Sequence, residues 1–317
     1  MNATTTIDPV QLADAPVSSR KGFIRSTILG ERKALIGLLI VLFFIIVSLL
    51  APQLAPYSPH QKVGPVYAPP SSKYPLGLDD GGVDMLSLML YGGRISLLVG
   101  FAAAAVAIII GGGVGLIAGY AGGKTDGVLM RITDYFLVIP DVPLMIVAAA
   151  IFGQSTLNII VIIGLIYWTS TARLIRAQVK SVRERVYVKR ARALGATNTR
   201  LIGHHVLPQV APLLVANTVL MIATAIFAET YVAFLGLGDP AAISWGGLIE
   251  NAQNGGAVFH DAWWAVVPPG LAVTVVILAC TMMGQSIEDS LNPRLRVGHL
   301  SVRRFRMRAL RGGITDP

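Results

Sequence analysis

The chain has 317 residues, of which 54% are hydrophobic and only 14% are charged. An ordinary soluble domain has about 25% charged residues, so this composition excludes a single soluble domain and indicates a membrane protein. The net charge of +9 could suggest a nucleic-acid-binding protein. Lys and Arg gather instead in alternate segments between apolar runs, which is the pattern that orients membrane proteins, and we expect no nucleic-acid partner.

Six apolar windows carry the hydrophobic content, and each approaches or exceeds the ~17–20 residues that cross the hydrocarbon core. They are residues 34–52, 95–120, 135–152, 157–172, 209–228 and 262–287. The third window is interrupted by Pro140, Asp141 and Pro143, and Pro268 with Pro269 predicts a break at the start of the sixth. The pattern predicts an all-α, polytopic membrane protein with six transmembrane helices.

The second window is rich in small residues, with AAAA at 102–105 and GGGVG at 111–115. Small residues let helix backbones approach closely inside a membrane, so we expect this helix to be buried against a neighbour. No Gly-Lys-Ser/Thr follows the glycines, which argues against a phosphate-binding loop.

The basic residues predict the orientation of the chain. Five occur in 1–33, nine in 173–200 and seven in the tail from residue 294, whereas 239–261 has none. We therefore expect both termini and the loop 173–208 in the cytoplasm. The predicted organisation is a partly disordered N-terminal tail (1–33), a first transmembrane helix (34–52), an external segment (53–93), a transmembrane core (94–290) and a basic cytoplasmic tail (291–317) that contacts membrane lipids.

A polar and basic stretch, YVKRARALGATNTRLIGHHVLP at 187–208, separates two of the most apolar segments. Its spacing predicts a short amphipathic helix with an apolar face opposite a basic one. The apolar face holds Tyr187, Ala191 and Leu194, and the basic face holds Lys189 and Arg192.

Turn signals follow this helix. Gly195 predicts a helix stop with positive φ, and either Thr197 or Asn198 predicts the N-cap of a second short helix. Pro208 suits the first turn of the next apolar run. The stretch is therefore expected to be a helix, a glycine turn and a second helix that leads into a membrane span.

This pattern resembles the cytoplasmic coupling loop of permease subunits of binding-protein-dependent ATP-binding-cassette (ABC) importers. That family has Glu-Ala-Ala, three residues, Gly, and later an aliphatic residue before Leu-Pro. The corresponding positions here are Lys189, Arg190, Ala191, Gly195, His205, Leu207 and Pro208, so the Glu, the first Ala and the aliphatic residue are replaced. The flanking ARLIRAQV (172–179), RERVYV (183–188) and RALGA (192–196) resemble the dipeptide, oligopeptide and nickel branch, in its C-type permease.

Three other segments resemble the same family. PLGLDDGGVD with GGRISL (75–97) is similar to the entry into its second span, with Val83 where the family has Arg. ETYVAFLGLG, which begins at Glu229, resembles the outer end of its fifth span, and Ser244-Trp245-Gly246 matches an external loop. GQSIEDSLNPRLR (284–296) is similar to its closing motif.

Several ionisable residues are candidates for function or structure. Asp79, Asp80 and Asp84 could hold a hard cation, but capping of the helix that follows is a sufficient use. Asp141 lies within the third window, where a carboxylate is costly unless a water-filled cavity or a neighbouring helix receives it. We expect Asp141 to line the translocation path, and Glu229 to line it or to act as a gate or packing residue.

The sequence shows no recognisable set of catalytic residues. The histidines show no ligand spacing with cysteine or carboxylate, and the single cysteine, Cys280, permits no intramolecular disulfide. The chain has no nucleotide-binding motif, so we expect a non-enzymatic subunit without a cofactor, whose partners bind ATP and Mg.

The resemblance implies a type I ABC importer permease fold with a coupling helix between spans 4 and 5. It implies a complex in the cytoplasmic membrane with a paralogous permease, two ATP-binding subunits and an extracytoplasmic substrate-binding protein. Peptides are the favoured substrate, nickel is the alternative, and a secondary transporter, a channel or an ABC exporter half is a weaker reading. The residues implied to couple to the ATPase are Tyr187, Val188, Lys189, Arg190, Ala191, Arg192, Ala193, Leu194, Gly195 and Ala196.

Overall fold

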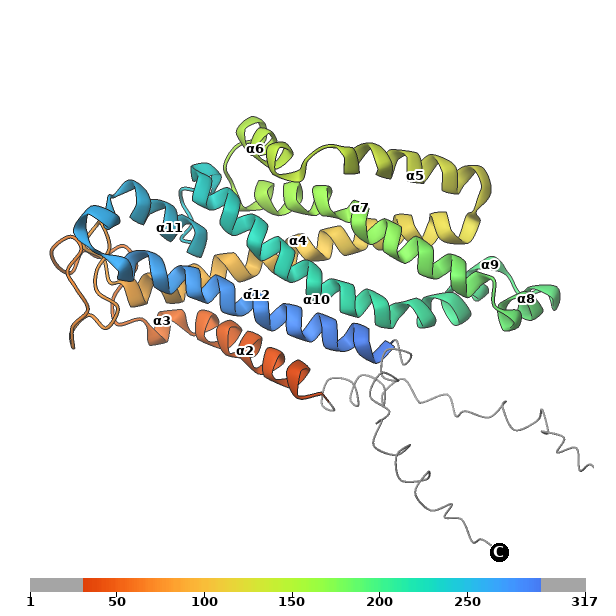
Figure 1. The fold of residues 1–317 in the computed structure, drawn as a ribbon, viewed down its shortest axis with the longest axis horizontal. Coiled ribbons are helices and arrows are strands. Elements are labelled where there is room, and N and C mark those ends of the chain that lie inside the picture. Colours follow the sequence, from red (N-terminus) through yellow and green to blue (C-terminus); the bar gives the residue numbers. More distant parts are fainter. Residues whose placement is uncertain (1–30, 292–317) are drawn as a thin grey trace, which may run out of the picture.

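The computed structural model describes residues 31–291, which form helices joined by loops (Figure 1). The predicted tails therefore lie largely outside the described residues. The α-helices are α2 (Arg32–Leu49), α3 (Ala51–Leu54), α4 (Met85–Ala121), α5 (Gly123–Val138), α6 (Asp141–Phe152), α7 (Thr156–Arg183), α8 (Val186–Ala193), α9 (Asn198–Arg200), α10 (Leu207–Val232), α11 (Trp245–Asn254) and α12 (Trp263–Leu291). Two π-helical segments, η2 (Leu201–Val206) and η3 (Ala233–Leu237), flank α10, and a 3-10 helix, η4 (Ala257–His260), precedes α12.

The described helices are long and apolar enough for five membrane spans, or six if one bent pair counts as a span. The five are α2, α4, α7, the run from α9 through η3, and α12. This confirms the all-α polytopic fold.

The third apolar window, 135–152, is broken at the prolines that interrupt it in the sequence. Its residues divide between α5 and α6, which are bent by 87° at the junction. Ile139 is extended (φ −77°, ψ 125°) and Pro140 precedes α6. A residue before proline is driven out of the helical region, and proline cannot donate the helical hydrogen bond, so the break falls here.

In the sixth window, the break that Pro268 and Pro269 predict is absent, so this prediction is wrong. The helix α12 runs through Pro268 and Pro269 without interruption. Both prolines lie in the second turn, where only a few hydrogen bonds of the helix depend on them, and the rest of the helix is intact.

A seam of small residues joins α4 to α7. A Cβ added to Gly111 would lie 2.3 Å from the Trp168 carbonyl oxygen, and one added to Gly115 would lie 2.5 Å from that of Ala172. Such distances leave no room for a side chain, so the two backbones touch along this face. The prediction that the second apolar window is buried against a neighbour is confirmed.

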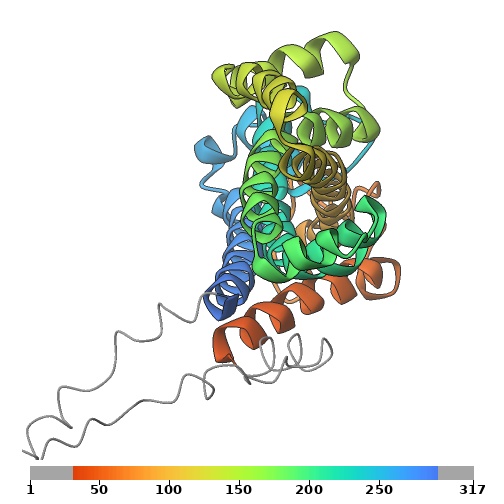
Figure 2. The ribbon, with the colours of Figure 1, turned by 90° about the vertical axis from the view of Figure 1, so that its right-hand side faces the viewer.

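The two ends of the bundle carry different structures. The helices α8 and α9 lie at one end, and α11 with the loop between α3 and α4 lies at the other (Figure 1). Viewed from the first end, α8 and α9 cross in front of the long helices (Figure 2). These two ends are called the α8 end and the α11 end below.

Loops at the α11 end are held by capping and by buried aromatic rings. Asp84 is the N-cap of α4 and accepts hydrogen bonds from the Ser87 N–H and hydroxyl, as the capping interpretation predicted. Trp263 is exposed, but Trp264 is buried and its indole N–H donates to the Leu78 carbonyl (3.1 Å). Of these two tryptophans, Trp263 is therefore the one placed to contact lipid.

Candidate functional site

The helix α8 is a short element between α7 and α9, and its end is closed by backbone hydrogen bonds. Gly195 has φ +86°, the Ala196 N–H donates to the Ala191 carbonyl (3.1 Å), and the Gly195 N–H donates to that of Arg192 (3.0 Å). This is a Schellman motif, which needs a left-handed residue that glycine adopts without strain. The Thr197 hydroxyl then accepts from the Arg200 N–H and caps α9. The predicted helix, glycine turn and second helix are present.

The burial of α8 differs along its surface. Val188 is fully buried in a cluster that also contains Val182, Leu201 and Val206. Tyr187 and Leu194, from the predicted apolar face, are 40% and 88% exposed. Ala191, the third residue of this face, is partly buried against the cluster, so only part of the apolar face is exposed. An exposed apolar surface on a protruding helix is suited to a partner protein.

The basic residues of α8 have different surroundings. The Lys189 ammonium lies 2.8 Å from the Glu184 carboxylate, and this hydrogen-bonded pair lowers the pKa of Glu184. The Arg192 guanidinium lies over the Tyr120 ring, 5.7 Å from its centroid, and contacts the hydroxyl. Glu184 of the same chain therefore compensates part of the positive charge of α8, at Lys189. Arg190 is exposed and forms no ion pair among the described residues.

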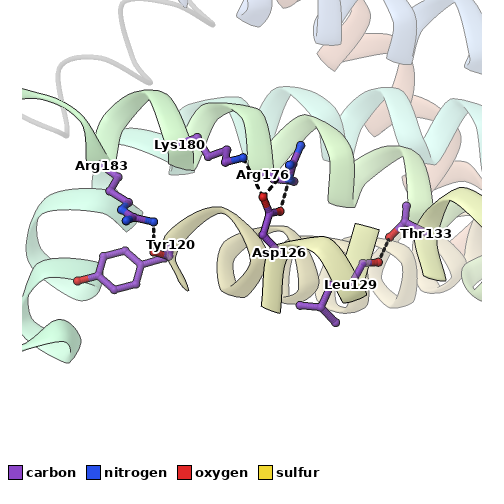
Figure 3. Close-up of polar contacts among 7 residues, drawn as sticks. All are labelled: Tyr120, Asp126, Leu129, Thr133, Arg176, Lys180 and Arg183. Carbon is purple, nitrogen blue, oxygen red and sulfur yellow. Dashed lines mark hydrogen bonds and ion pairs between the residues drawn. The ribbon is translucent and has the colours of Figure 1, made fainter. Parts of the chain in front are cut away.

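A group of charged residues links α5 to α7 (Figure 3). The Asp126 carboxylate accepts from the guanidinium of Arg176 and from the ammonium of Lys180 (2.8 Å). Arg183 donates to the Tyr120 carbonyl at the end of α4 (2.7 Å). This group was not among the residues predicted from the sequence. The spacing of Arg176, Lys180 and Arg183 on one helical face was a usable signal for a polar partner.

Asp141 lies at the start of α6, in the bend of the third window. Its carboxylate accepts hydrogen bonds from the Tyr167 hydroxyl (3.0 Å) and from the Val142 N–H (2.9 Å), and its side chain is exposed. It forms no ion pair among the described residues. That Asp141 lines a translocation path stays a prediction.

Glu229 occupies a buried position near the α11 end, with only 3% of its surface exposed. Its carboxylate accepts from the Ser96 hydroxyl (3.0 Å), and Ser96 in turn accepts from the Trp245 N–H (3.1 Å). These contacts join α10, α4 and α11. Asp239 and Ser244 lie with Glu229 around one small pocket. Within this chain Glu229 is a packing residue, and its role in a path is a prediction about the assembled transporter.

The fold and the site define a class of protein. The structure has five or six apolar spans and a short, partly exposed helix between the fourth and fifth of the predicted spans, which defines a multi-pass membrane protein.

Comparison with protein families identifies the group. Residues 111–297 match the family described as binding-protein-dependent transport system inner membrane component, and residues 30–70 match the N-terminal TM domain of oligopeptide transport permease C. The chain belongs to the family of binding-protein-dependent transport system inner membrane components. Its members are permeases of ABC transporters, which work with ATPase and binding-protein partners.

Curated relatives cover most of this chain. It is 36% identical to a dipeptide transport system permease protein of Alkalihalophilus pseudofirmus, over 84% of this chain and 87% of the relative. It is 34% identical to a di/tripeptide transport system permease protein of Pseudomonas aeruginosa, over 84% and 89%. An oligopeptide transport system permease protein of Bacillus subtilis is 31% identical over 84% and 87%.

Proposed function

We propose that this chain is the permease subunit of an ATP-driven importer of di- or oligopeptides in the cytoplasmic membrane. The observation that carries the proposal is the similarity, over 84% of the chain, to permeases whose names specify dipeptide, di/tripeptide or oligopeptide transport. The exposed side chains of α8 and of its C-cap, which include Arg190 and Leu194, supply a surface that such a subunit needs for coupling.

In this proposal the α8 end faces the cytoplasm, because nine Lys and Arg residues lie in 173–200. Both termini are on the same side. The chain pairs with a paralogous permease, and two ATP-binding subunits hold ATP and Mg and carry out hydrolysis. A substrate-binding protein delivers peptide at the α11 end.

The proposed cycle uses residues 187–196 as the contact between permease and ATPase. Closure of the ATPase subunits on ATP displaces α8, which switches the permease pair from an inward-facing to an outward-facing state. The Schellman motif at Gly195 keeps α8 at a defined angle to α9, so a displacement of α8 is passed to the long helices. Asp141 and Glu229 are proposed to line the path that opens between the paired permeases.

The test is transport by the complete complex in proteoliposomes with its binding protein. We expect ATP-dependent uptake of a labelled dipeptide or a longer peptide, and no uptake with a non-hydrolysable ATP analogue. ATP-dependent uptake of nickel without any uptake of peptide would support the alternative substrate. Uptake without ATP would refute the ABC mechanism and favour a secondary transporter or channel.

A further inference from the structure

Tyr120 is the last but one residue of α4, and it contacts three separate segments at the α8 end. Its hydroxyl donates to the Asn198 side-chain carbonyl of α9 (2.8 Å) and accepts from Arg192 of α8 (3.3 Å). Its backbone carbonyl accepts from Arg183 at the end of α7 (2.7 Å; Figure 3). One residue of α4 therefore joins the ends of α7, α8 and α9.

The ring of Tyr120 adds a packing contact to these hydrogen bonds. It is 91% buried in the same cluster as Val188, which is the buried side chain of α8. The Arg192 guanidinium lies over its face. α8 is thus held to the body of the bundle by a buried valine and by Tyr120, while its other face is exposed. A displacement of α8 must either move Tyr120 or break these contacts.

The helix α4 continues from Tyr120 to the α11 end without a break. Ser96 lies 24 residues before Tyr120, or about 36 Å along the helix at ~1.5 Å per residue. There its hydroxyl donates to Glu229 and accepts from the N–H of Trp245 at the start of α11. The glycine seam holds the middle of α4 against α7. A single rigid helix therefore connects the α8 contacts of Tyr120 with the bonds that hold α11 in place.

We infer that Tyr120 is a positioning residue for coupling: its hydroxyl fixes the orientation of α8 and α9 relative to α4, so that motion imposed on α8 is transmitted along α4 to the α11 end. The inference rests on the proposed role of α8 as the ATPase contact. It assigns the transmission step to one side chain and to one helix.

A purely structural role for Tyr120 would reside in its ring, which fills the cluster around Val188. Tyr120→Phe keeps the ring and its contact with the Arg192 guanidinium, and removes only the hydroxyl. Asn198→Ala removes the other partner of the hydrogen bond. Tyr91→Phe is the matched control, because Tyr91 lies on the same helix and its ring contact with Arg94 survives the substitution.

The experiment uses the assembled complex in proteoliposomes, with two measurements for each variant: hydrogen exchange of the amides in 186–200, and peptide imported per ATP hydrolysed. A net hydrogen bond is typically worth a factor of about 2–10 in an equilibrium constant. We expect Tyr120→Phe to speed exchange and to lower peptide per ATP by about that factor. Asn198→Ala should do the same, the double variant should be less than additive, and Tyr91→Phe should match wild type.

Unchanged exchange and unchanged peptide per ATP in Tyr120→Phe would overturn the inference. Faster exchange with normal peptide per ATP would overturn it too, because the hydroxyl would then stabilise α8 without serving coupling. Fewer peptides imported per ATP with unchanged amide exchange would also overturn the inference, because the effect of the hydroxyl would then not pass through α8. If the wild-type complex imports no peptide, the proposed substrate fails. In that case two other measurements test the inference: hydrogen exchange of the amides in 186–200, and the stimulation of ATP hydrolysis by the binding protein. The inference stands only if both change in Tyr120→Phe.

Discussion

Lys189 and Arg190 are neighbours in the sequence, but the fold gives them different electrostatic roles. Lys189 reaches Glu184, which follows the last residue of α7, and the side chains of both are more than half exposed. Surface pairs of this kind contribute little to stability because water screens them. Arg190 is exposed, and among the described residues no acidic side chain pairs with it. Of these two neighbours, Arg190 is therefore the one whose charge has no acidic partner among the described residues.

Arg190→Glu is expected to weaken retention of the ATPase subunits during purification, with a larger effect at low salt. A charge that is desolvated at an interface can cost ~2–5 kcal/mol when its partner is lost, and reversal adds repulsion. Lys189→Gln is the matched control, and it should retain the ATPase nearly as well as wild type. The measurement is the stoichiometry of co-purified subunits. Full retention by Arg190→Glu would place this side chain on a solvated or lipid-facing surface.

Asp141→Asn tests the path residue. The amide has one acceptor oxygen in place of two, so it can keep the hydrogen bond from the Tyr167 hydroxyl but then loses the one from the Val142 N–H, while the charge is removed. We expect normal assembly with a transport rate lowered about tenfold or more, because a carboxylate in a membrane segment is retained at a cost only where water or substrate solvates it. Loss of assembly, with normal transport in the surviving complexes, would point to a structural role instead.

At the scale of elements, the contact between α4 and α7 depends on residues without side chains. The glycine face of α4 lies against carbonyl groups of α7, where an added Cβ has no space. Gly115→Val should therefore force the helices apart and destabilise the chain by at least the ~1–3 kcal/mol typical of an overpacked core. The check is the thermal unfolding midpoint in detergent.

Gly113→Ala is the control for this prediction, since it lies two residues away on the same helix and an added Cβ meets nothing within 4 Å. Its midpoint should equal or slightly exceed that of wild type, because alanine favours helix more than glycine does. Equal destabilisation by the two substitutions would show that the glycines matter for helix flexibility, and not for the close contact with α7.

The elements differ in how far the sequence predicts them. Hydropathy and window length identified the helices that cross the membrane, because each must satisfy its backbone internally in lipid. Prolines were ambiguous signals: Pro140 marks a bend of 87° between α5 and α6, whereas α12 passes through Pro268 and Pro269. Pro268 and Pro269 lie in the second turn of α12, where few helical hydrogen bonds depend on them, whereas Pro140 lies at a junction between two helices.

The candidate site was predictable where it depends on local turn chemistry. Gly195 and Thr197 occupy the stop and cap positions because their conformations follow from their own side chains. The contacts of Tyr120 with Arg192 and Asn198 join residues 72 and 78 positions apart. No periodic pattern in a single sequence specifies such pairs, so this part of the site emerged only from the fold.

At the scale of the whole molecule, the α8 end and the α11 end are opposite in position and in composition (Figure 1). The α8 end carries the basic residues of 173–200, and the 239–261 segment at the α11 end has neither Lys nor Arg. This asymmetry predicts that the α8 end is cytoplasmic.

Labelling of single cysteines in a Cys280→Ala background tests this orientation. A cysteine at Asn254 should react with a membrane-impermeant reagent added to intact cells, and one at Thr199 should react only after permeabilisation. Both positions are exposed in the chain, so access to the reagent depends on the side of the membrane. Reaction of the Thr199 position from outside would reverse the proposed orientation.

The central claim is that ATP hydrolysis by partner subunits drives peptide import through α8, and the number of peptides imported per ATP hydrolysed by the Gly195→Val complex tests it most directly. Valine at φ +86° is strained, so the turn that sets the angle of α8 should be lost while the long helices remain. The account predicts that this complex keeps its ATPase subunits and hydrolyses ATP while peptide uptake falls about tenfold or more. Peptide import at the wild-type ratio in a Gly195→Val complex of full subunit composition would contradict it.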